Sequence, residues 1–236
     1  MNALRGFLGT VAIALAAILA PEIAAAGTIV RFTVNTGTTG IIDVELQDEA
    51  MPITVANFLG YVSAGAYDST IFHRSTTYDP TNIQVVQGGG YALSGNQLVN
   101  VPTVAPIVLE TGTLGNVRGT IAMARGAATD SATSQFYFNV QDNPGLDGNY
   151  AVFGSVIGSL ATLDAIGSAS VYDLTQQLGP AFAEMPLLQP SLDASSLVLV
   201  SSVQVVPEPS TLALAACGVG VAAVAAVRRR AARRGR

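Results

Sequence analysis

Residues 72–91 read FHRSTTYDPTNIQVVQGGGY and hold the side chains of this chain best suited to chemistry. His73 is the single His of the sequence and stands next to Arg74, and three consecutive Gly follow at 88–90. A metal site, a phosphate-binding loop and a solvated turn would each use some of these residues. The rest of the sequence has to decide between them.

Composition excludes most catalytic groups that act without a cofactor. Because Cys217 is the single Cys, residues 27–206 hold no Cys and cannot form an internal disulfide or a His/Cys zinc site. A Cys–His pair is excluded as well, and a Ser–His–Asp triad would have to use His73. The Gly run lacks the G-x-G-x-x-G spacing, and no helical pattern follows it. We therefore expect neither a metal nor a cofactor.

The charge of the central region argues against nucleic acid as a partner. Residues 27–206 carry four Arg, no Lys and fourteen acidic residues, a net charge of −10. Such a surface repels phosphate. Abundant acids could also supply the carboxylate pair of a glycosidase, but a solvated acidic face explains them more simply.

The elements that must position His73 and Arg74 are mostly short strands. Residues 28–35 and 41–47 predict a hairpin, since apolar and acidic residues alternate in the second run. Apolar residues at i, i+3, i+4 and i+7 predict a helix over 52–65. Further strands are expected at 69–74, 83–89, 119–125, 134–140, 150–157 and 195–206.

A second, short helix is expected after Gly158, with Ser159 as its N-cap. Residues 172–194 are rich in Pro and turn residues and predict a long loop. Many short strands with only two helices indicate a mainly β fold, an antiparallel barrel or sandwich. No internal repeat is present, so residues 27–206 are expected to form one domain.

Both ends of the chain carry targeting patterns. Residues 1–26 combine Arg5, an apolar run and a small-residue cleavage site, which predicts a secretory signal peptide; an N-terminal membrane anchor is the alternative. Residues 207–236 begin with Pro207-Glu208-Pro209, continue with an apolar stretch over 211–227 and end in six Arg. That stretch would span about 25 Å as a helix, slightly less than a bilayer core of about 30 Å.

By physics alone, the C-terminal pattern is a membrane anchor with its Arg-rich end in the cytoplasm. Its order and spacing resemble a PEP-CTERM sorting signal of exported bacterial proteins. That resemblance implies that an exosortase-type enzyme reads Pro207, Glu208 and Pro209. It also implies transient anchoring in the inner membrane, followed by a place at the cell surface, in the envelope or outside the cell.

The central region resembles a cyclophilin-type peptidyl-prolyl cis–trans isomerase over about residues 30–206. The resemblance rests on four motifs in the order of the family: Phe72-His73-Arg74, Gln87-Gly88-Gly89, Ser134-Gln135-Phe136 and Phe153-Gly154. It implies an eight-stranded antiparallel barrel capped by two helices, with a peptide groove on the outer face. It also implies a monomer that acts on proline-containing polypeptides and assists protein folding.

The residue types agree with that chemistry. Rotation about an Xaa-Pro bond needs no nucleophile, because its barrier of about 18–20 kcal/mol comes from amide resonance. A catalyst has to hold the proline ring and to place a donor near the prolyl nitrogen, whose lone pair appears only as the amide twists. A guanidinium stays charged and holds a fixed donor geometry, so Arg74 suits this role, while His73 is expected to pack.

The resemblance assigns the site residue by residue. Arg74 matches the catalytic Arg, and Gln87 matches the Gln that positions the substrate and this Arg. The remaining matches are expected to bind substrate: Val85, Ala124, Gln135, Phe136, Tyr137, Leu146 and Tyr150.

Several positions depart from the family pattern. Twelve residues separate Arg74 from Gln87 where the common form has seven, and Arg125 replaces an Asn. Gln84 and Val85 replace a Phe and a Met, which is expected to shrink and polarise the proline pocket. Gly145 replaces a Trp, which implies weak cyclosporin binding, and Tyr150 replaces a His. A catalytically weak binding or structural module of the cell envelope is therefore the alternative function.

Overall fold

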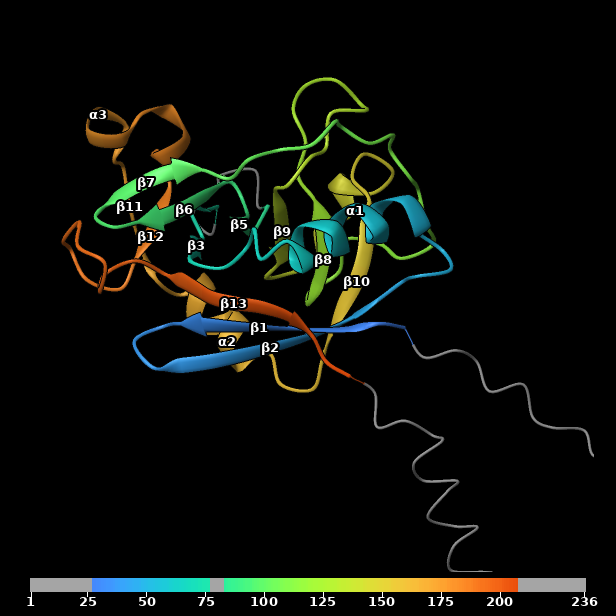
Figure 1. The fold of residues 1–236 in the computed structure, drawn as a ribbon, viewed down its shortest axis with the longest axis horizontal. Coiled ribbons are helices and arrows are strands. Elements are labelled where there is room, and N and C mark those ends of the chain that lie inside the picture. Colours follow the sequence, from blue (N-terminus) through green and yellow to red (C-terminus); the bar gives the residue numbers. More distant parts are fainter. Residues whose placement is uncertain (1–26, 77–82, 208–236) are drawn as a thin grey trace, which may run out of the picture.

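The structure is a computed structural model and describes residues 27–76 and 83–207 (Figure 1). The predicted signal peptide at 1–26 and the predicted apolar helix at 211–227 lie outside these residues, as do Glu208 and Pro209. Within the described ranges, no helix is long and apolar enough to cross a membrane.

The N-terminal hairpin forms as predicted. β1 (Ile29–Asn35) pairs antiparallel with β2 (Thr39–Leu46), from Ile29 opposite Glu45 to Asn35 opposite Thr39. Every second side chain of each strand is buried, because alternate residues of a strand face opposite sides of the sheet. The hairpin therefore contributes one apolar face to the core and one charged face to solvent.

The described strands form a curled antiparallel sheet of eleven strands and a separate two-stranded sheet (Figure 1). The order in the large sheet is β4-β5-β9-β8-β10-β2-β1-β13-β3-β6-β7. Its other strands are β3 (Thr70–Ile71), β4 (Arg74–Ser75), β5 (Val85–Gly88), β6 (Tyr91–Ser94), β7 (Gln97–Asn100), β8 (Thr120–Met123), β9 (Phe136–Asn139), β10 (Val152–Ile157) and β13 (Leu199–Val205). β11 (Ser170–Tyr172) and β12 (Met185–Leu187) form the small sheet.

An aromatic cluster fills the inside of the curled sheet. Phe32 of β1 lies 5.4 Å from both Phe136 and Phe138 of β9, measured between ring centroids in edge-on contacts. The predicted first helix, α1 (Pro52–Ser63), places Phe58 in the same cluster, 5.0 Å from Phe153. Edge-on aromatic pairs add to the stabilisation from burial, so these rings fix the strands around one core.

The expectation of eight strands is wrong. The run predicted as one strand at 69–74 divides into β3 and β4, because the chain changes its pairing partner in between. The Phe72 N–H donates to the Val198 carbonyl, and the His73 N–H donates to the Gln87 carbonyl. The sequence pattern also did not predict the hairpin of β6 and β7.

The expectation of two helices is also too low. α2 (Ala161–Gly167) is the predicted second helix, with Leu160 at the N-cap in place of Ser159, whose hydroxyl still accepts from the Ala161 N–H at 3.2 Å. The segment predicted as a loop at 172–194 contains α3 (Thr175–Leu178) and β12. Two 3-10 helices, η1 (Pro144–Leu146) and η2 (Pro180–Phe182), complete the described elements.

The Gly run at 88–90 allows a close approach to the segment that precedes β9. Gly89 has φ +76°, and a Cβ atom there would lie 2.7 Å from the Ser134 carbonyl oxygen. A Cβ on Gly90 would lie 2.9 Å from the side chain of Gln135. β5 therefore ends at Gly88 and the chain turns into β6 tightly against the segment that leads into β9.

We expect Gly89→Ala to lower the free energy of unfolding by about 3 kcal/mol, because it combines a left-handed backbone with a clash. Gly95→Ala is the matched control, since Gly95 has φ +60° but no atom within 4 Å of the position that a Cβ would take. That control should lose only about 1 kcal/mol. Urea unfolding of both variants checks this, and equal losses would show that the close approach at Gly89 has no energetic role.

Candidate functional site

The strand register places a row of side chains across one face of the sheet. Arg74 of β4 lies opposite Gln87 of β5, and Gln87 lies opposite Tyr137 of β9. The row continues to Ala122 of β8 and Val152 of β10. Residues that are directly opposite in a sheet point to the same side. Five strands thus bring together residues that are far apart in the sequence.

The neighbouring row faces the core instead. Val86 lies opposite Phe138, and Phe138 lies opposite Ile121. All three are fully buried in the aromatic core. One face of these strands is therefore used for stability, and the other face carries the candidate site.

A cavity of about 430 Å³ lies on the face that carries Arg74 and Gln87. Its apolar part comes from a small cluster in which Val85 and Tyr137 are buried. Such a volume is within the range of small-molecule and peptide pockets. Further lining residues come from the loops around the strands: Ile83, Ala124, Arg125, Leu146 and Tyr150.

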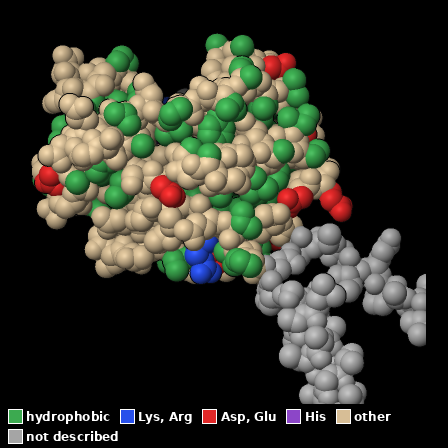
Figure 2. All heavy atoms as spheres, in the orientation of Figure 1, with side chains coloured by type: hydrophobic (Ala, Val, Ile, Leu, Met, Phe, Trp, Pro, Cys, Tyr) green, Lys and Arg blue, Asp and Glu red, His purple; other side chains and the backbone are tan. Residues whose placement is uncertain are grey.

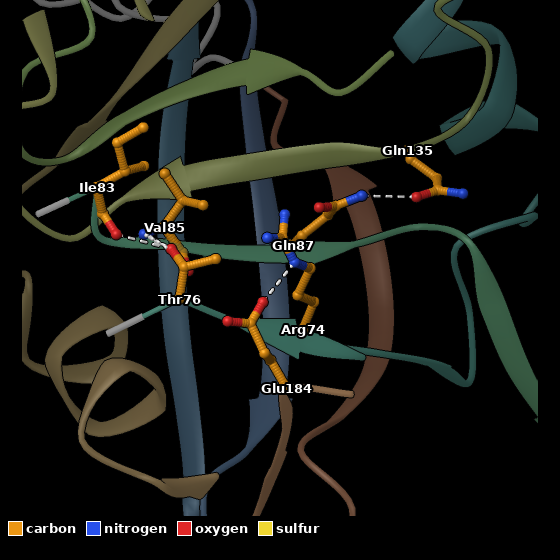
Figure 3. A network of polar contacts seen from close by, with 7 residues as sticks. All are labelled: Arg74, Thr76, Ile83, Val85, Gln87, Gln135 and Glu184. Carbon is orange, nitrogen blue, oxygen red and sulfur yellow. Dashed lines mark hydrogen bonds and ion pairs between the residues drawn. The ribbon is translucent and has the colours of Figure 1, made fainter. Parts of the chain in front are cut away.

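Arg74 is held at the rim of this cavity by an ion pair. Its Nε donates to Oε2 of Glu184 at 2.8 Å (Figure 3). The Ser75 N–H donates to the Glu184 carbonyl at 2.7 Å, so the backbone of Glu184 is attached to β4 as well. A guanidinium carries five N–H donors and this contact uses one of them. The Arg74 side chain keeps 42% of its surface exposed and can meet a ligand.

Gln87 and Gln135 are joined beside Arg74. Nε2 of Gln87 donates to Oε1 of Gln135 at 2.7 Å (Figure 3). Gln87 comes from β5 and Gln135 directly precedes β9, and both side chains line the cavity. This bond fixes the orientation of the two side-chain amides. It does not involve Oε1 of Gln87 or Nε2 of Gln135.

Two Tyr residues form the far wall of the cavity. The rings of Tyr137 and Tyr150 lie 5.6 Å apart in an edge-on contact. Burial raises the pKa of the Tyr137 hydroxyl, which stays protonated and donates to Oδ1 of Asn116 at 2.6 Å. Arg125 covers Tyr150, with its guanidinium carbon 5.0 Å from the ring centroid. This wall of the cavity is thus aromatic, with the Tyr137 hydroxyl bound to Asn116 and the Arg125 guanidinium stacked on Tyr150.

The expectation that Gln84 polarises the proline pocket is wrong. Gln84 does not line the cavity, because Ile83, Val85 and Gln87 alternate onto its face and Gln84 points to the other side. The backbone of Gln84 is bound by the side chain of Asn143, which accepts from its N–H and donates to its carbonyl, both at 3.0 Å. The pocket therefore remains apolar next to Val85.

Phe136 is also misplaced by the sequence-based assignment. Its side chain is fully buried in the aromatic core and does not line the cavity. Strand alternation explains this, because Gln135 and Tyr137 on either side of it face the cavity. The structure brings together the other predicted residues: Arg74, Val85, Gln87, Ala124, Gln135, Tyr137, Leu146 and Tyr150.

Sequence reasoning missed several residues at this site, including Ile83, Thr76 and Glu184. Ile83 could have been found by counting back two positions from Val85. Thr76 accepts from the Val85 N–H at 3.0 Å and donates to the Ile83 carbonyl at 3.0 Å, which secures the start of β5 (Figure 3). Glu184 carried no usable signal, because it lies 110 residues from Arg74 in the chain.

His73 is packed into the wall of the cavity, as expected. It is 3% exposed, and its ring lies 4.9 Å from the ring of Tyr91. Its Nδ1 has no hydrogen-bond partner in the part of the chain that the structure describes. Burial, followed by the nearby charge of Arg74, lowers the pKa of His73 to about 4. The imidazole is therefore neutral at pH 7 and adds no second positive charge next to Arg74.

This pKa shift predicts a pH-dependent stability. The unfolded His binds a proton below about pH 6.5, whereas the folded His binds one only near pH 4, so stability falls as the pH drops between these values. We expect a loss of about 2 kcal/mol between pH 7 and pH 4.5. Because His73 is the single His, His73→Phe should remove most of this slope in urea unfolding. An unchanged slope in His73→Phe would contradict the assignment.

Comparisons with known proteins match these features. Residues 30–181 match the family described as cyclophilin type peptidyl-prolyl cis-trans isomerase/CLD, and residues 205–230 match the PEP-CTERM protein-sorting motif. A peptidyl-prolyl cis-trans isomerase of Acinetobacter baylyi is 40% identical over 179 residues, 72% of this chain and 89% of that protein. Peptidyl-prolyl cis-trans isomerase A of Dickeya dadantii is 40% identical over 151 residues, 61% of this chain and 73% of that protein.

The fold has solved relatives as well. A cyclophilin type isomerase of Cryptosporidium parvum, crystallised in the presence of the dipeptide Ala-Pro, superposes with a TM-score of 0.55 at 21% identity. The match covers 76% of this chain and 99% of that structure. The sorting motif indicates an exported protein with a C-terminal sorting signal. With the family match extending over most of the described residues, the chain belongs to the cyclophilin-type peptidyl-prolyl cis-trans isomerase family.

Proposed function

We propose that this protein catalyses cis–trans isomerisation of Xaa-Pro bonds in exported or surface polypeptides and so assists their folding. The observation that carries the proposal is the position of Arg74, directly opposite Gln87 at the rim of a cavity that has one apolar wall. Family membership and the names of the relatives agree with it.

The apolar side of the cavity is suited to a proline ring. Val85, Tyr137 and Leu146 present hydrocarbon and ring surface, and burial of such surface is favourable in proportion to its area. A ring held there leaves the preceding peptide bond near the rim. The substrate is then bound on one side of the bond while the other side remains free to rotate.

Arg74 supplies the stabilisation that differs between ground state and transition state. In the planar amide the lone pair of the prolyl nitrogen is delocalised, and it becomes an acceptor only as the bond twists. A guanidinium donor placed there binds the twisted form more strongly, which lowers the barrier without a covalent step. The neutral amides of Gln87 and Gln135 can hold the substrate backbone beside it.

The site works within a larger architecture that we also propose. Residues 1–26 would be removed as a signal peptide, residues 27–206 would form the catalytic domain, and residues 207–236 would be the sorting signal. An exosortase-type enzyme would recognise Pro207-Glu208-Pro209 while the segment at 211–227 holds the protein transiently in the inner membrane. We expect the catalytic domain to be monomeric.

The central test is a proline isomerisation assay on a short Ala-Pro peptide with wild type and Arg74→Ala. We expect Arg74→Ala to lower kcat/KM by about 100-fold, the usual effect of removing one donor to a transition state. Arg118→Ala is the matched control, since Arg118 forms an exposed ion pair with Asp164 and does not line the cavity. It should retain wild-type activity.

A folded wild-type protein that does not accelerate the reaction would reject the catalytic role. The alternative, a binding or structural module of the cell envelope, would then follow if peptides still bind in the cavity. Equal losses in Arg74→Ala and Arg118→Ala would instead show a general effect of charge.

Glu184 should act as a positioning residue through Arg74. Glu184→Gln keeps the shape of the side chain but removes the charge that holds Nε of Arg74. We expect kcat to fall about fivefold with little change in KM, because orientation of a donor matters most in the transition state. Asp164→Asn, which breaks the exposed pair with Arg118, is the control. An unchanged kcat in Glu184→Gln would reject this role.

A further inference from the structure

A second and larger cavity lies beside the candidate active site. It has a volume of about 920 Å³ and forms a groove between the β6–β7 hairpin on one side and α3, η2 and residues 192–197 on the other. Its floor is a separate apolar cluster that includes Leu197 and Phe182. The proposed isomerisation of one Xaa-Pro bond makes no use of this groove.

The groove adjoins the active-site cavity, and the two share one aromatic wall. Tyr91 lines both cavities, and its ring lies 4.6 Å from Phe182 of the groove and 4.9 Å from His73 of the site. Ala181, the residue before Phe182, lines the active-site cavity. A polypeptide that extends from the active site past Tyr91 would reach the groove within a few residues, because each extended residue advances about 3.3 Å.

The lining selects apolar side chains. Val99 and Leu192 are 42% and 49% exposed and leave apolar surface in the groove for a ligand. Hydrophobic side chains are also scattered over the face of the molecule that Figure 2 shows. Asp193 is the charged residue among the lining side chains. Its carboxylate already accepts hydrogen bonds from Ser191 and Ser195, so it is engaged within its own loop. Anionic ligands find no cationic partner among these lining residues.

The β6–β7 hairpin also offers backbone hydrogen-bonding groups to an extended peptide. β7 stands at the end of the strand order in the described sheet. An edge strand presents N–H and carbonyl groups with which a peptide can pair, while pockets beside it receive alternate side chains. Leu98 and Val99 belong to this strand and line the groove. The groove therefore combines a backbone edge with apolar pockets.

We propose that this groove is a subsite for apolar residues that flank the isomerised Xaa-Pro bond in the same polypeptide. The proposal rests on the proposed isomerase function and names its preferred substrates, unfolded exported chains with apolar residues near proline. Binding energy from the groove would lower KM for such chains, and it would be absent for a short peptide that fills only the active-site cavity.

The test compares three Ala-Pro peptides with the full-length protein. One is short, one carries three Leu on the N-terminal side of Ala-Pro, and one carries them on the C-terminal side; versions with Ser in place of Leu serve as references. We expect one of the Leu peptides to have a KM about tenfold below that of its Ser reference. Val99→Glu should remove that advantage without changing kcat/KM on the short peptide.

Val108→Glu is the matched control, because Val108 is 51% exposed and does not line either cavity. It should retain the tenfold preference. Failure of the wild type on the short peptide would reject the proposed function, whereas activity on the short peptide without any Leu preference would reject the subsite alone. Sedimentation gives a further check: a wild-type dimer that Val99→Glu converts to monomer would assign the groove to a second copy and overturn the proposal.

Discussion

The pairing register of β4, β5, β9 and β8 is the constraint on which the site depends. Arg74, Gln87 and Tyr137 lie directly opposite one another on the outer face, and Val86 and Phe138 lie opposite each other on the inner face. A shift of one residue would exchange the two rows, because the side-chain period of a strand is two. The aromatic core then would hold Gln and Arg, and the cavity would hold Phe. Core packing therefore also fixes the geometry of the cavity.

The aromatic core enforces this register at the Gly run. A Cβ on Gly88 would lie 3.3 Å from the rings of Phe72 and Phe136, so the rings close against the backbone of β5. Gly89 then turns the chain away with a left-handed backbone. Close packing of this kind leaves little freedom to slide one strand along another. The three Gly contribute to function by fixing where β5 ends and thus which face carries Gln87.

The sequence pattern predicted the elements that depend on contacts between residues close together in the chain. The hairpin of β1 and β2 and the helix α1 follow from periodicity, and Arg74 and Gln87 follow from motifs that the family shares. The errors have two causes. Gln84 and Phe136 were placed by position in a motif, although strand alternation turns both away from the cavity. The ion pair of Glu184 and the division of the predicted strand at Phe72 depend on partners that are distant in the chain. The hydrophobic periodicity of a sequence carries no information about such partners.

The segment at 172–194 links the two cavities, although its Pro and turn residues suggested only a loop. It supplies Glu184 to Arg74 through an ion pair and Phe182 to the wall of the groove. Only one residue, Ala183, separates Phe182 from Glu184, and the hydrogen bond from Ser75 holds Glu184 on β4. A displacement of Phe182 by a ligand in the groove would therefore be transmitted over a short, anchored stretch to the carboxylate that orients Arg74. Recognition of flanking residues, as proposed, and orientation of the guanidinium would then both depend on the same short stretch, residues 182–184.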